Sequence, residues 1–436
     1  MSKVIDMLEA QVIELTPAAP ANTYYDMARK EYLWPLASGG WIPLNETQCK
    51  RHLRADGYRT KPEEGEPISA VDKALIELQV RRGVDYAGPL AGHRAGHYRM
   101  QGKDILVTTS PVIPKPEPGE WPTIMALLDS LLFDVDHDQL GTFYAWVKTF
   151  LESLMHGPPR TGQALALCGP IGCGKSLLQV LLTILMGGRV SKPYQFALGE
   201  SGFNADLFQA EHLCIEDEAP STDMRARRTL GAFIKGVAAN QVHRLHAKNR
   251  DAVTLEPLWR LTISCNDEPE HLLTLPPLDE SILDKIIMLR CSRPETPFND
   301  GTPTGRRDYW NRLVSEVPAF VHHLLGWQIP EHLACSRFGV KAFQHPALVE
   351  ALLELSSERK CLSLIEMAVD LPWEGTAEEL ERLLREHSST RYEAGQLLKW
   401  QAALGTFLGR LSKTDPERVM RMPREHGGRR QWTIRP

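Results

Sequence analysis

Residues 163–188 read QALALCGPIGCGKSLLQVLLTILMGG, and the rest of the chain is organised around them. The stretch opens with a short apolar run typical of a buried strand. After the glycines it continues as a helical run that ends at Gly187 and Gly188. Between the two lies a complete G-x-x-x-x-G-K-[ST] motif, made of Gly169, Pro170, Ile171, Gly172, Cys173, Gly174, Lys175 and Ser176. A strand before this motif and a helix after it predict a phosphate-binding loop.

The chemistry of such a loop follows from its residue types. Its glycines let consecutive backbone N–H groups turn toward one phosphate, which also lies at a helix N-terminus. Lys175 is expected to reach the β- and γ-phosphates of a nucleotide, and Ser176 to ligate Mg²⁺. The alternative is a Gly-rich turn that binds no nucleotide. The full spacing and the Lys–Ser pair favour the nucleotide site.

A second apolar run, 213–215, ends in three consecutive acids, Glu216, Asp217 and Glu218. Beside a phosphate loop, this pattern is typical of a Walker B strand. One acid holds the Mg²⁺ shell, and a neighbour orients or deprotonates the attacking water. Asp217 is the expected metal ligand, because the middle acid keeps that role whichever neighbour is the base. Glu218 is the base if the working pair is Asp-Glu, and Glu216 if it is Glu-Asp. An acidic loop after a core strand is the alternative.

The segment from Arg225 to Arg250 holds seven Lys or Arg residues and no Asp or Glu, in a chain whose net charge is −5. Its second half predicts a hairpin, with strands over 242–248 and 252–255. The candidate DNA-binding residues of this hairpin are Arg244, His246, Lys248, Asn249 and Arg250. Alternation along a strand places the first three on one face, where they suit a nucleic-acid backbone. A solvated charged hairpin is the alternative.

Further polar residues follow the next apolar run, 261–265. Asn266 comes directly after that run, and its amide could hydrogen-bond a γ-phosphate or the attacking water, although an Asn that caps a turn is common. Lys285, Arg290 and Arg293 are cations that could act on a neighbouring subunit's nucleotide, or simply pair with surface acids.

The order of these features resembles the superfamily 3 helicases, which are AAA+ ring motors. More closely, it resembles the primase-helicase proteins of phages and mobile elements, over residues 120–295. The resemblance implies ATP and Mg²⁺ as cofactors, a ring oligomer (most simply a hexamer), and single-stranded DNA in the ring pore. It gives Asn266 the role of sensor, and His246 and Lys248 that of gripping DNA. Where the family usually has an arginine finger, this chain has Lys285, so the choice among Lys285, Arg290 and Arg293 stays open.

The implied fold class is α/β, an AAA+ P-loop core with a smaller region on each side. Residues 1–109 predict a small α/β region in which Asn45 caps a helix, and the prolines of 110–120 predict a linker. Residues 121–300 are the expected ATPase core and 301–345 a helical lid. Residues 346–436 predict helices and a Gly-turn hairpin, which resembles a winged helix. This end is locally basic and could bind duplex DNA, or dock a protein instead.

Composition narrows the class of protein further. The 436 residues are 42% hydrophobic and 24% charged, as in an ordinary soluble protein, and no apolar run approaches the ~18 residues needed to cross a membrane. The eight cysteines show no C-x-x-C spacing, which predicts reduced, buried thiols in a cytosolic protein. The resemblance to proteins of phages and mobile elements implies the cytoplasm of a bacterial host cell.

We therefore expect a DNA helicase or translocase that serves the replication of a phage or mobile element. The alternatives are an AAA+ initiator or loader that does not unwind DNA, and a non-catalytic DNA-binding adaptor. Nothing in residues 1–109 indicates priming chemistry, so a primase or polymerase would be a separate partner.

Overall fold

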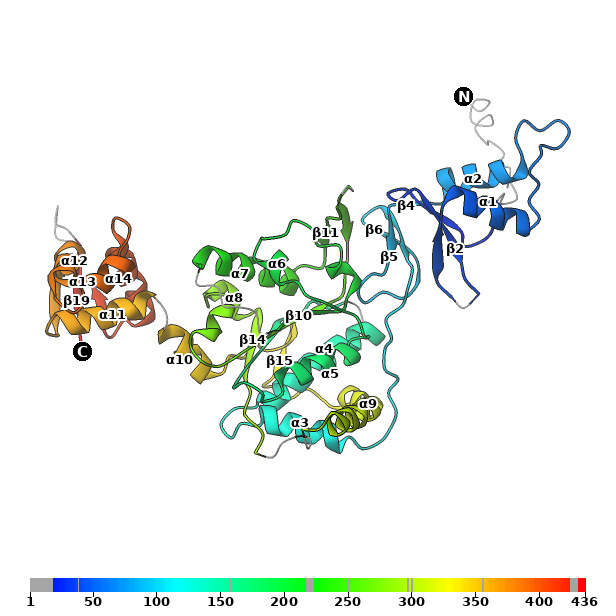
Figure 1. Cartoon of the computed structure of the whole chain (residues 1–436). Coiled ribbons are helices and arrows are strands. Elements are labelled where there is room, and N and C mark those ends of the chain that lie inside the picture. The colour runs from blue at the N-terminus through cyan, green and yellow to red at the C-terminus, as the bar shows by residue number, and fades with distance from the viewer. Residues whose placement is uncertain are drawn as a thin grey trace, which may run out of the picture.

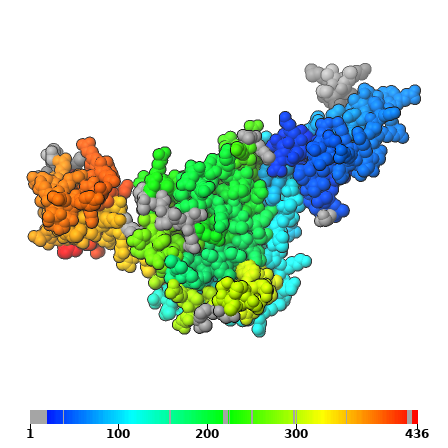
Figure 2. Space-filling view, viewed as in Figure 1, coloured from blue at the N-terminus to red at the C-terminus, as the bar shows by residue number. Residues whose placement is uncertain are grey.

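The computed structural model of the chain describes residues 19–37, 39–156, 159–216, 223–248, 251–295, 298, 301–354, 357–423 and 430–436. Figures 1 and 2 show a central body with a smaller lobe on each side. None of the helices in these ranges is both long and apolar enough to span a membrane.

The central body is built on a five-stranded sheet of order β14-β8-β13-β10-β9, in which every pairing is parallel. Its strands are β8 (Ala164–Cys168), β9 (Val190–Ser191), β10 (His212–Glu216), β13 (Arg260–Cys265) and β14 (Ile286–Arg290). β8, β10 and β13 are the three apolar runs that the sequence predicts as strands. β8 is buried throughout, as expected when helices cover both faces of a parallel sheet.

Alternate residues of β8 enter two different cores. Leu165 and Leu167 pack with α3 (Pro122–Leu132), α4 (Gln139–Met155), α5 (Lys175–Leu185) and α9 (Pro303–Gly326). Ala164 and Ala166 face the other layer, which includes α7 (Met224–Ala239). Figure 1 shows α3, α4, α5 and α9 gathered below the sheet, and α7 above it with α6 (Tyr194–Ala197) and α8 (Glu280–Leu283).

Buried polar side chains join α5 to the sheet. The Gln179 Nε2 donates to Thr262 Oγ1 (2.9 Å) and to the Ile215 carbonyl oxygen (3.2 Å). The His212 ring lies 2.7 Å from Thr183 Oγ1 through one nitrogen and 2.7 Å from Thr262 Oγ1 through the other. These contacts fix the position of α5 along β10 and β13.

The N-terminal residues form two small sheets. The first has order β3-β2-β1-β4 and carries two helices; its elements are β1 (Tyr24–Asp26), β2 (Glu31–Pro35), β3 (Trp41–Leu44), α1 (Glu46–Ala55), α2 (Ala70–Arg81) and β4 (Gly83–Val84). Asn45 caps α1 with a complete capping box, so the prediction of this helix start is confirmed. The second sheet has order β5-β7-β6, with β5 (Tyr86–Gly88), β6 (Gly96–Met100) and β7 (Lys103–Val107).

The second of these sheets is attached to the central body beside the C-terminal end of α5. The Glu211 carboxylate accepts from the Gly92 N–H (2.7 Å) and pairs with Arg189, whose guanidinium also donates to the Leu90 carbonyl oxygen. The segment 108–121 then runs to α3 without helix or strand, and its Val112 N–H donates to the Gly187 carbonyl oxygen (2.9 Å).

The C-terminal lobe follows a short hairpin, β15 (Ala334–Cys335) and β16 (Gly339–Val340), and α10 (Pro346–Glu354). In chain order it contains α11 (Ser357–Ala368), β17 (Trp373–Thr376), α12 (Ala377–Glu386), α13 (Arg391–Leu397), α14 (Ala403–Thr414), β18 (Val419–Arg421) and β19 (Gln431–Ile434). Its sheet has order β17-β19-β18. The lobe has its own core around Trp432, and Figure 2 shows it as a body of its own, set off from the centre.

We predict an acid sensitivity that originates at His212. Burial lowers the pKa of His212 from 6.5 to about 3, so the folded protein holds the ring neutral. Below pH 6.5 the unfolded chain takes up a proton that the folded chain cannot, so the free energy of unfolding falls by up to ~1.4 kcal/mol per pH unit. Denaturant titrations between pH 7.5 and 5 measure this slope, which should be shallower in His212→Gln. Equal slopes in the two proteins would contradict the assignment.

Candidate functional site

The predicted phosphate loop joins β8 to α5 as the motif requires. Gly172 and Gly174 have φ of +75° and +118°, a region that favours glycine. Gly169 is equally constrained, because a Cβ there would lie 2.4 Å from the Cys291 carbonyl oxygen. Ile171 at the loop's apex is 65% exposed, and Ser176 is exposed at the start of α5. Pro170 and Cys173 complete the turn. The loop therefore has the backbone shape and the exposed helix start that phosphate binding needs.

Lys175 and Asn266, predicted to share one site, are in contact. The Lys175 Nζ donates to Asn266 Oδ1 (3.2 Å), and to the carbonyl oxygens of Gly169 (2.6 Å) and Pro170 (3.0 Å). Asn266 follows β13, which lies directly beside β8, so the carboxyl ends of the two strands meet. In this arrangement the ammonium is folded onto its own loop, and a phosphate would have to replace the carbonyl oxygens around it.

The acid-ended strand β10 lies on the other side of β13. Glu216 at its end is half-buried and pairs with Lys192, with 2.9 Å between Nζ and Oε2. Its other oxygen lies 3.6 Å from Cys214 Sγ. The two remaining candidate acids, Asp217 and Glu218, lie outside the described residues. Glu216 is thus placed at the same sheet edge as the phosphate loop, already paired with a cation.

The basic hairpin exists, but its first strand is shorter than predicted. β11 covers His243–Leu245 and β12 covers Val253–Leu255, against the predicted 242–248 and 252–255. The ladder ends at Leu245, because the Asn204 side chain bonds backbone groups on either side of that residue. Its Nδ2 donates to the Arg244 carbonyl oxygen (3.1 Å) and its Oδ1 accepts from the His246 N–H (2.7 Å).

The exposure of the hairpin follows the predicted alternation. Arg244, His246 and Lys248 are exposed, whereas Leu245 between them is buried. Asn249 and Arg250 lie outside the described residues. Figure 1 shows β11 projecting from the top of the central body.

The three candidate finger cations are divided between opposite edges of the sheet. Arg290 ends β14 in register with Cys168, and the Arg293 Nη2 donates to the Ile171 carbonyl oxygen of the chain's own phosphate loop (3.0 Å). Lys285 precedes β14 at the amino edge, where its carbonyl oxygen accepts from the Ala164 N–H. Only Lys285 therefore lies far from the phosphate loop of its own chain.

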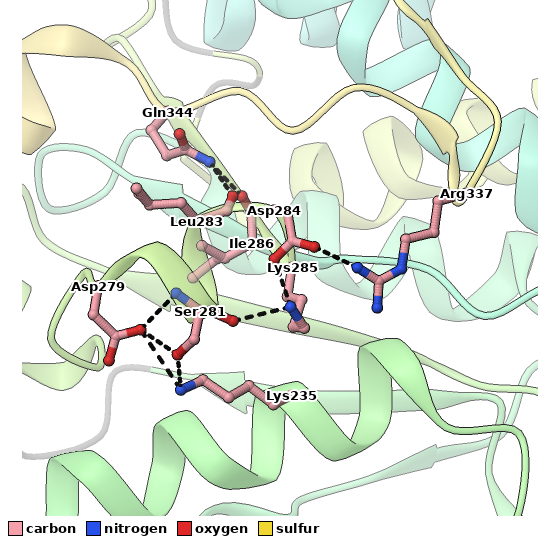
Figure 3. A network of polar contacts seen from close by, with 9 residues as sticks. All are labelled: Lys235, Asp279, Ser281, Leu283, Asp284, Lys285, Ile286, Arg337 and Gln344. Atoms are coloured by element: carbon pink, nitrogen blue, oxygen red, sulfur yellow. Dashed lines mark hydrogen bonds and ion pairs between the residues drawn. The ribbon is translucent and has the colours of Figure 1, made fainter.

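Lys285 is also held by its neighbours (Figure 3). Its Nζ donates to the Ser281 carbonyl oxygen (2.9 Å) and pairs with Asp284 Oδ1 (2.5 Å), which leaves the side chain 14% exposed. The same carboxylate pairs through Oδ2 with Arg337 (2.6 Å), whose side chain is 54% exposed. Gln344 closes the network by donating to the carbonyl oxygens of Leu283 and Ile286. The more accessible cation here is Arg337, which belongs to no motif and which the sequence does not single out.

Asp134, His137 and His345 are the one group in the described ranges whose side chains converge closely enough to be considered as metal ligands. The His345 Nε2 lies 3.1 Å from Asp134 Oδ2, while its Nδ1 accepts from the Ala347 N–H (3.2 Å). Because Nδ1 accepts, Nε2 carries the proton and donates to Asp134. His345 then has no free lone pair for a metal, and the group is a hydrogen-bonded tie between 134–137 and the start of α10.

No protein-family model and no curated protein matches the sequence. Among solved structures, the chain is similar to the apo structure of the NrS-1 C-terminal region, residues 305–718. The TM-score is 0.56 at 15% identity, over 94% of this chain and 95% of that one. A second apo structure of that region, in its A form, gives a TM-score of 0.54 at 14% identity over 95% and 96%. The chain therefore shares this mixed α/β fold along nearly its whole length.

Two proteins described as helicases match much more loosely. The SCCmec type IV Cch helicase gives a TM-score of 0.31 at 8% identity, over 91% of this chain and 73% of that one. The JCV helicase gives 0.23 at 16% identity, over 56% and 70%.

We predict that Asn204 determines the shape of the basic hairpin. Asn204→Ala removes the two hydrogen bonds that the side chain makes to the backbone of the hairpin. This loss should destabilise the hairpin by about 1–3 kcal/mol. Hydrogen exchange over 243–248 should then speed up by about tenfold or more. Asn240→Ala, which alters an exposed residue at the base of the same hairpin, is the matched control. Unchanged exchange in Asn204→Ala would contradict this role.

Proposed function

We propose that the chain is an ATP-dependent DNA helicase or translocase with a superfamily 3 type AAA+ core. It would act as a ring, most simply a hexamer, in replication of a phage or mobile genetic element. The observation that carries the proposal is the contact of Lys175 with Asn266 at the carboxyl edge of a parallel sheet. A phosphate-loop lysine and a strand-end amide meet there, beside a strand that ends in acids.

ATP and Mg²⁺ fit the residues at this edge. The positive φ of Gly172 and Gly174 turns the loop around a phosphate, and the Lys175 ammonium already rests on oxygen atoms that a phosphate oxygen could replace. The exposed Ser176 hydroxyl would hold Mg²⁺ together with Asp217. Bound Mg²⁺ would neutralise charge on the transferring phosphoryl group. Asn266 would orient the water, with Glu218 or Glu216 as its base.

The position of the amino-edge cations supports a ring. Lys285 and Arg337 lie at the edge opposite the phosphate loop, so they could serve only the nucleotide of a neighbouring subunit. We assign the finger role to this pair, because Arg290 and Arg293 lie beside the loop of their own chain. Arg337 offers the planar guanidinium that Lys285 lacks.

DNA would contact two surfaces. The exposed face of Arg244, His246 and Lys248 suits the backbone of a single strand in the pore. The C-terminal lobe places α14 before the β18–β19 hairpin, with β17 completing the sheet. This order of elements supports a winged-helix-like domain and duplex binding.

The decisive test compares wild type with Lys175→Ala. Wild type should hydrolyse ATP, hydrolyse it faster with single-stranded DNA, and displace a strand from a forked duplex. Loss of the ammonium should lower turnover about a hundredfold or more, because it removes charge stabilisation of the phosphates. Hydrolysis without strand displacement would favour the initiator or loader alternative. Normal turnover in Lys175→Ala would refute the assignment of the site.

We predict that Lys248 contributes to DNA affinity through charge alone. Lys248→Ala should weaken single-strand binding equally for different sequences, and should reduce the slope of log affinity against log salt by about 1. Fluorescence anisotropy at several salt concentrations measures both. Lys115→Ala, which removes an exposed lysine from segment 108–121, is the matched control. An unchanged slope in Lys248→Ala would show that the hairpin does not bind DNA.

A further inference from the structure

Arg337 lies in the turn between β15 and β16, and this short hairpin is fixed to the central body. The Gln163 Nε2 donates to the carbonyl oxygen of Val340 (2.8 Å), whose side chain is fully buried in the core below the sheet. Gly339 approaches α4 so closely that a Cβ there would lie 2.5 Å from Thr149 Cγ2. The turn that carries Arg337 therefore has a rigid support.

Two contacts hold the Arg337 guanidinium in one orientation. Its Nη1 donates to Asp284 Oδ2 (2.6 Å), and its Cζ lies 4.7 Å from the centre of the buried Phe338 ring. Arg337 makes no other polar contact with the residues that the structure describes, and 54% of its side chain is exposed. An arginine that is restrained on one side and open on the other is pre-organised to bind a phosphate through two parallel hydrogen bonds.

The Asp284 carboxylate that holds Arg337 is itself fixed by its backbone (Figure 3). Asp284 directly follows α8, and the Gln344 side chain bonds the chain on both sides of it. The Gln344 Nε2 donates to the carbonyl oxygens of Leu283 (2.8 Å) and Ile286 (2.7 Å). The carboxylate thus has a defined position from which to orient a side chain of the neighbouring hairpin.

Lys285 is bound to the same carboxylate but is far less accessible than Arg337. Its Nζ lies between Asp284 Oδ1 (2.5 Å) and the Ser281 carbonyl oxygen (2.9 Å), and 14% of its side chain is exposed. Both contacts would have to break before the ammonium could reach another subunit. Two cations and one carboxylate leave one net positive charge here, and Arg337 is the group that presents it to the exterior.

We propose that Arg337 alone is the finger within this pair of cations, and that Asp284 is the positioning residue that aims it at the γ-phosphate of a neighbouring subunit's nucleotide. Lys285 then supports Asp284 and is not a second finger. The inference rests on the function proposed above, because it needs that nucleotide.

The role of Asp284 follows from the geometry that a finger requires. An arginine finger raises turnover by about 10³–10⁵. A misplacement of about 1 Å can cost about a hundredfold in rate. Without its carboxylate partner the Arg337 guanidinium would lose the ion pair that orients it. Turnover should fall, whereas each chain should still bind its own nucleotide, because its phosphate loop lies at the opposite edge of the sheet.

The first test measures ATP hydrolysis by full-length variants with single-stranded DNA. Arg337→Ala should lower kcat about a hundredfold or more, and Asp284→Asn about tenfold or more. The KM for ATP and the affinity for a fluorescent ATP analogue should stay within about twofold of wild type, because the lost interaction belongs to the transition state. Asp308→Asn, which removes an exposed carboxylate paired with an arginine on α9, is the matched control and should hydrolyse ATP as wild type does.

The second test asks whether Arg337 acts across a subunit boundary. Arg337→Ala and Lys175→Ala are co-expressed with different affinity tags, and mixed rings are purified through both tags. The first variant keeps its phosphate loop and the second keeps its finger, so a boundary between them contains one complete site. Turnover of the mixed rings should clearly exceed that of either variant alone. Asp284→Asn in place of Arg337→Ala should recover in the same way.

The outcomes separate this inference from the proposed function. With an active wild type, normal turnover in Arg337→Ala, a larger loss in Lys285→Ala than in Arg337→Ala, or no recovery in the mixed rings would overturn the assignment of the finger. Normal turnover in Asp284→Asn would overturn its positioning role. A wild type that hydrolyses no ATP would refute the proposed function itself, and this inference with it.

Discussion

The structure depends on the hydrogen bonds that hold α5 against the central sheet. Gln179, His212 and Thr262 are buried and, with the half-buried Thr183, form a polar group joined by hydrogen bonds. Buried polar groups are costly when unpaired, so sliding α5 along the sheet would break several contacts at once. The helix therefore has one stable position. That position places Lys175, the first residue of α5, in contact with Asn266 at the carboxyl edge of the sheet.

The two edges of the sheet then differ in chemistry. The carboxyl edge carries the glycine loop, an amide and an acid, whereas the amino edge carries Asp284 between two cations. No single chain can bring both edges to one nucleotide, since the strands separate them. A molecule whose two edges differ in this way is suited to assemble head to tail. Such heterologous contacts form a closed ring when the rotation from one subunit to the next adds up to a full turn. The division thus supports the ring assembly that we propose.

Sequence reasoning succeeded where the signal is local. The glycine spacing, the apolar runs of β8, β10 and β13, and the cap at Asn45 each depend on neighbours in the chain, and the structure confirms these elements. It failed where residues far apart in the sequence determine the local structure. Asn204 shortens the strand predicted over 242–248, and nothing in the sequence links the two. Arg337 likewise matters only through a partner that folding brings close to it, Asp284. Asp217, Glu218, Asn249 and Arg250 remain predictions.

The attachment of the N-terminal sheet has a mechanical consequence. Glu211, Arg189 and Val112 fasten this region and the segment after it beside Gly187, where α5 ends. The eleven-residue helix is a stiff rod of about 16 Å, with the glycine loop at one end and this junction at the other. A shift of the rod along its axis would move both ends together. The helix α5 therefore connects the phosphate loop rigidly to the sheet β5-β7-β6 and the segment that follows it.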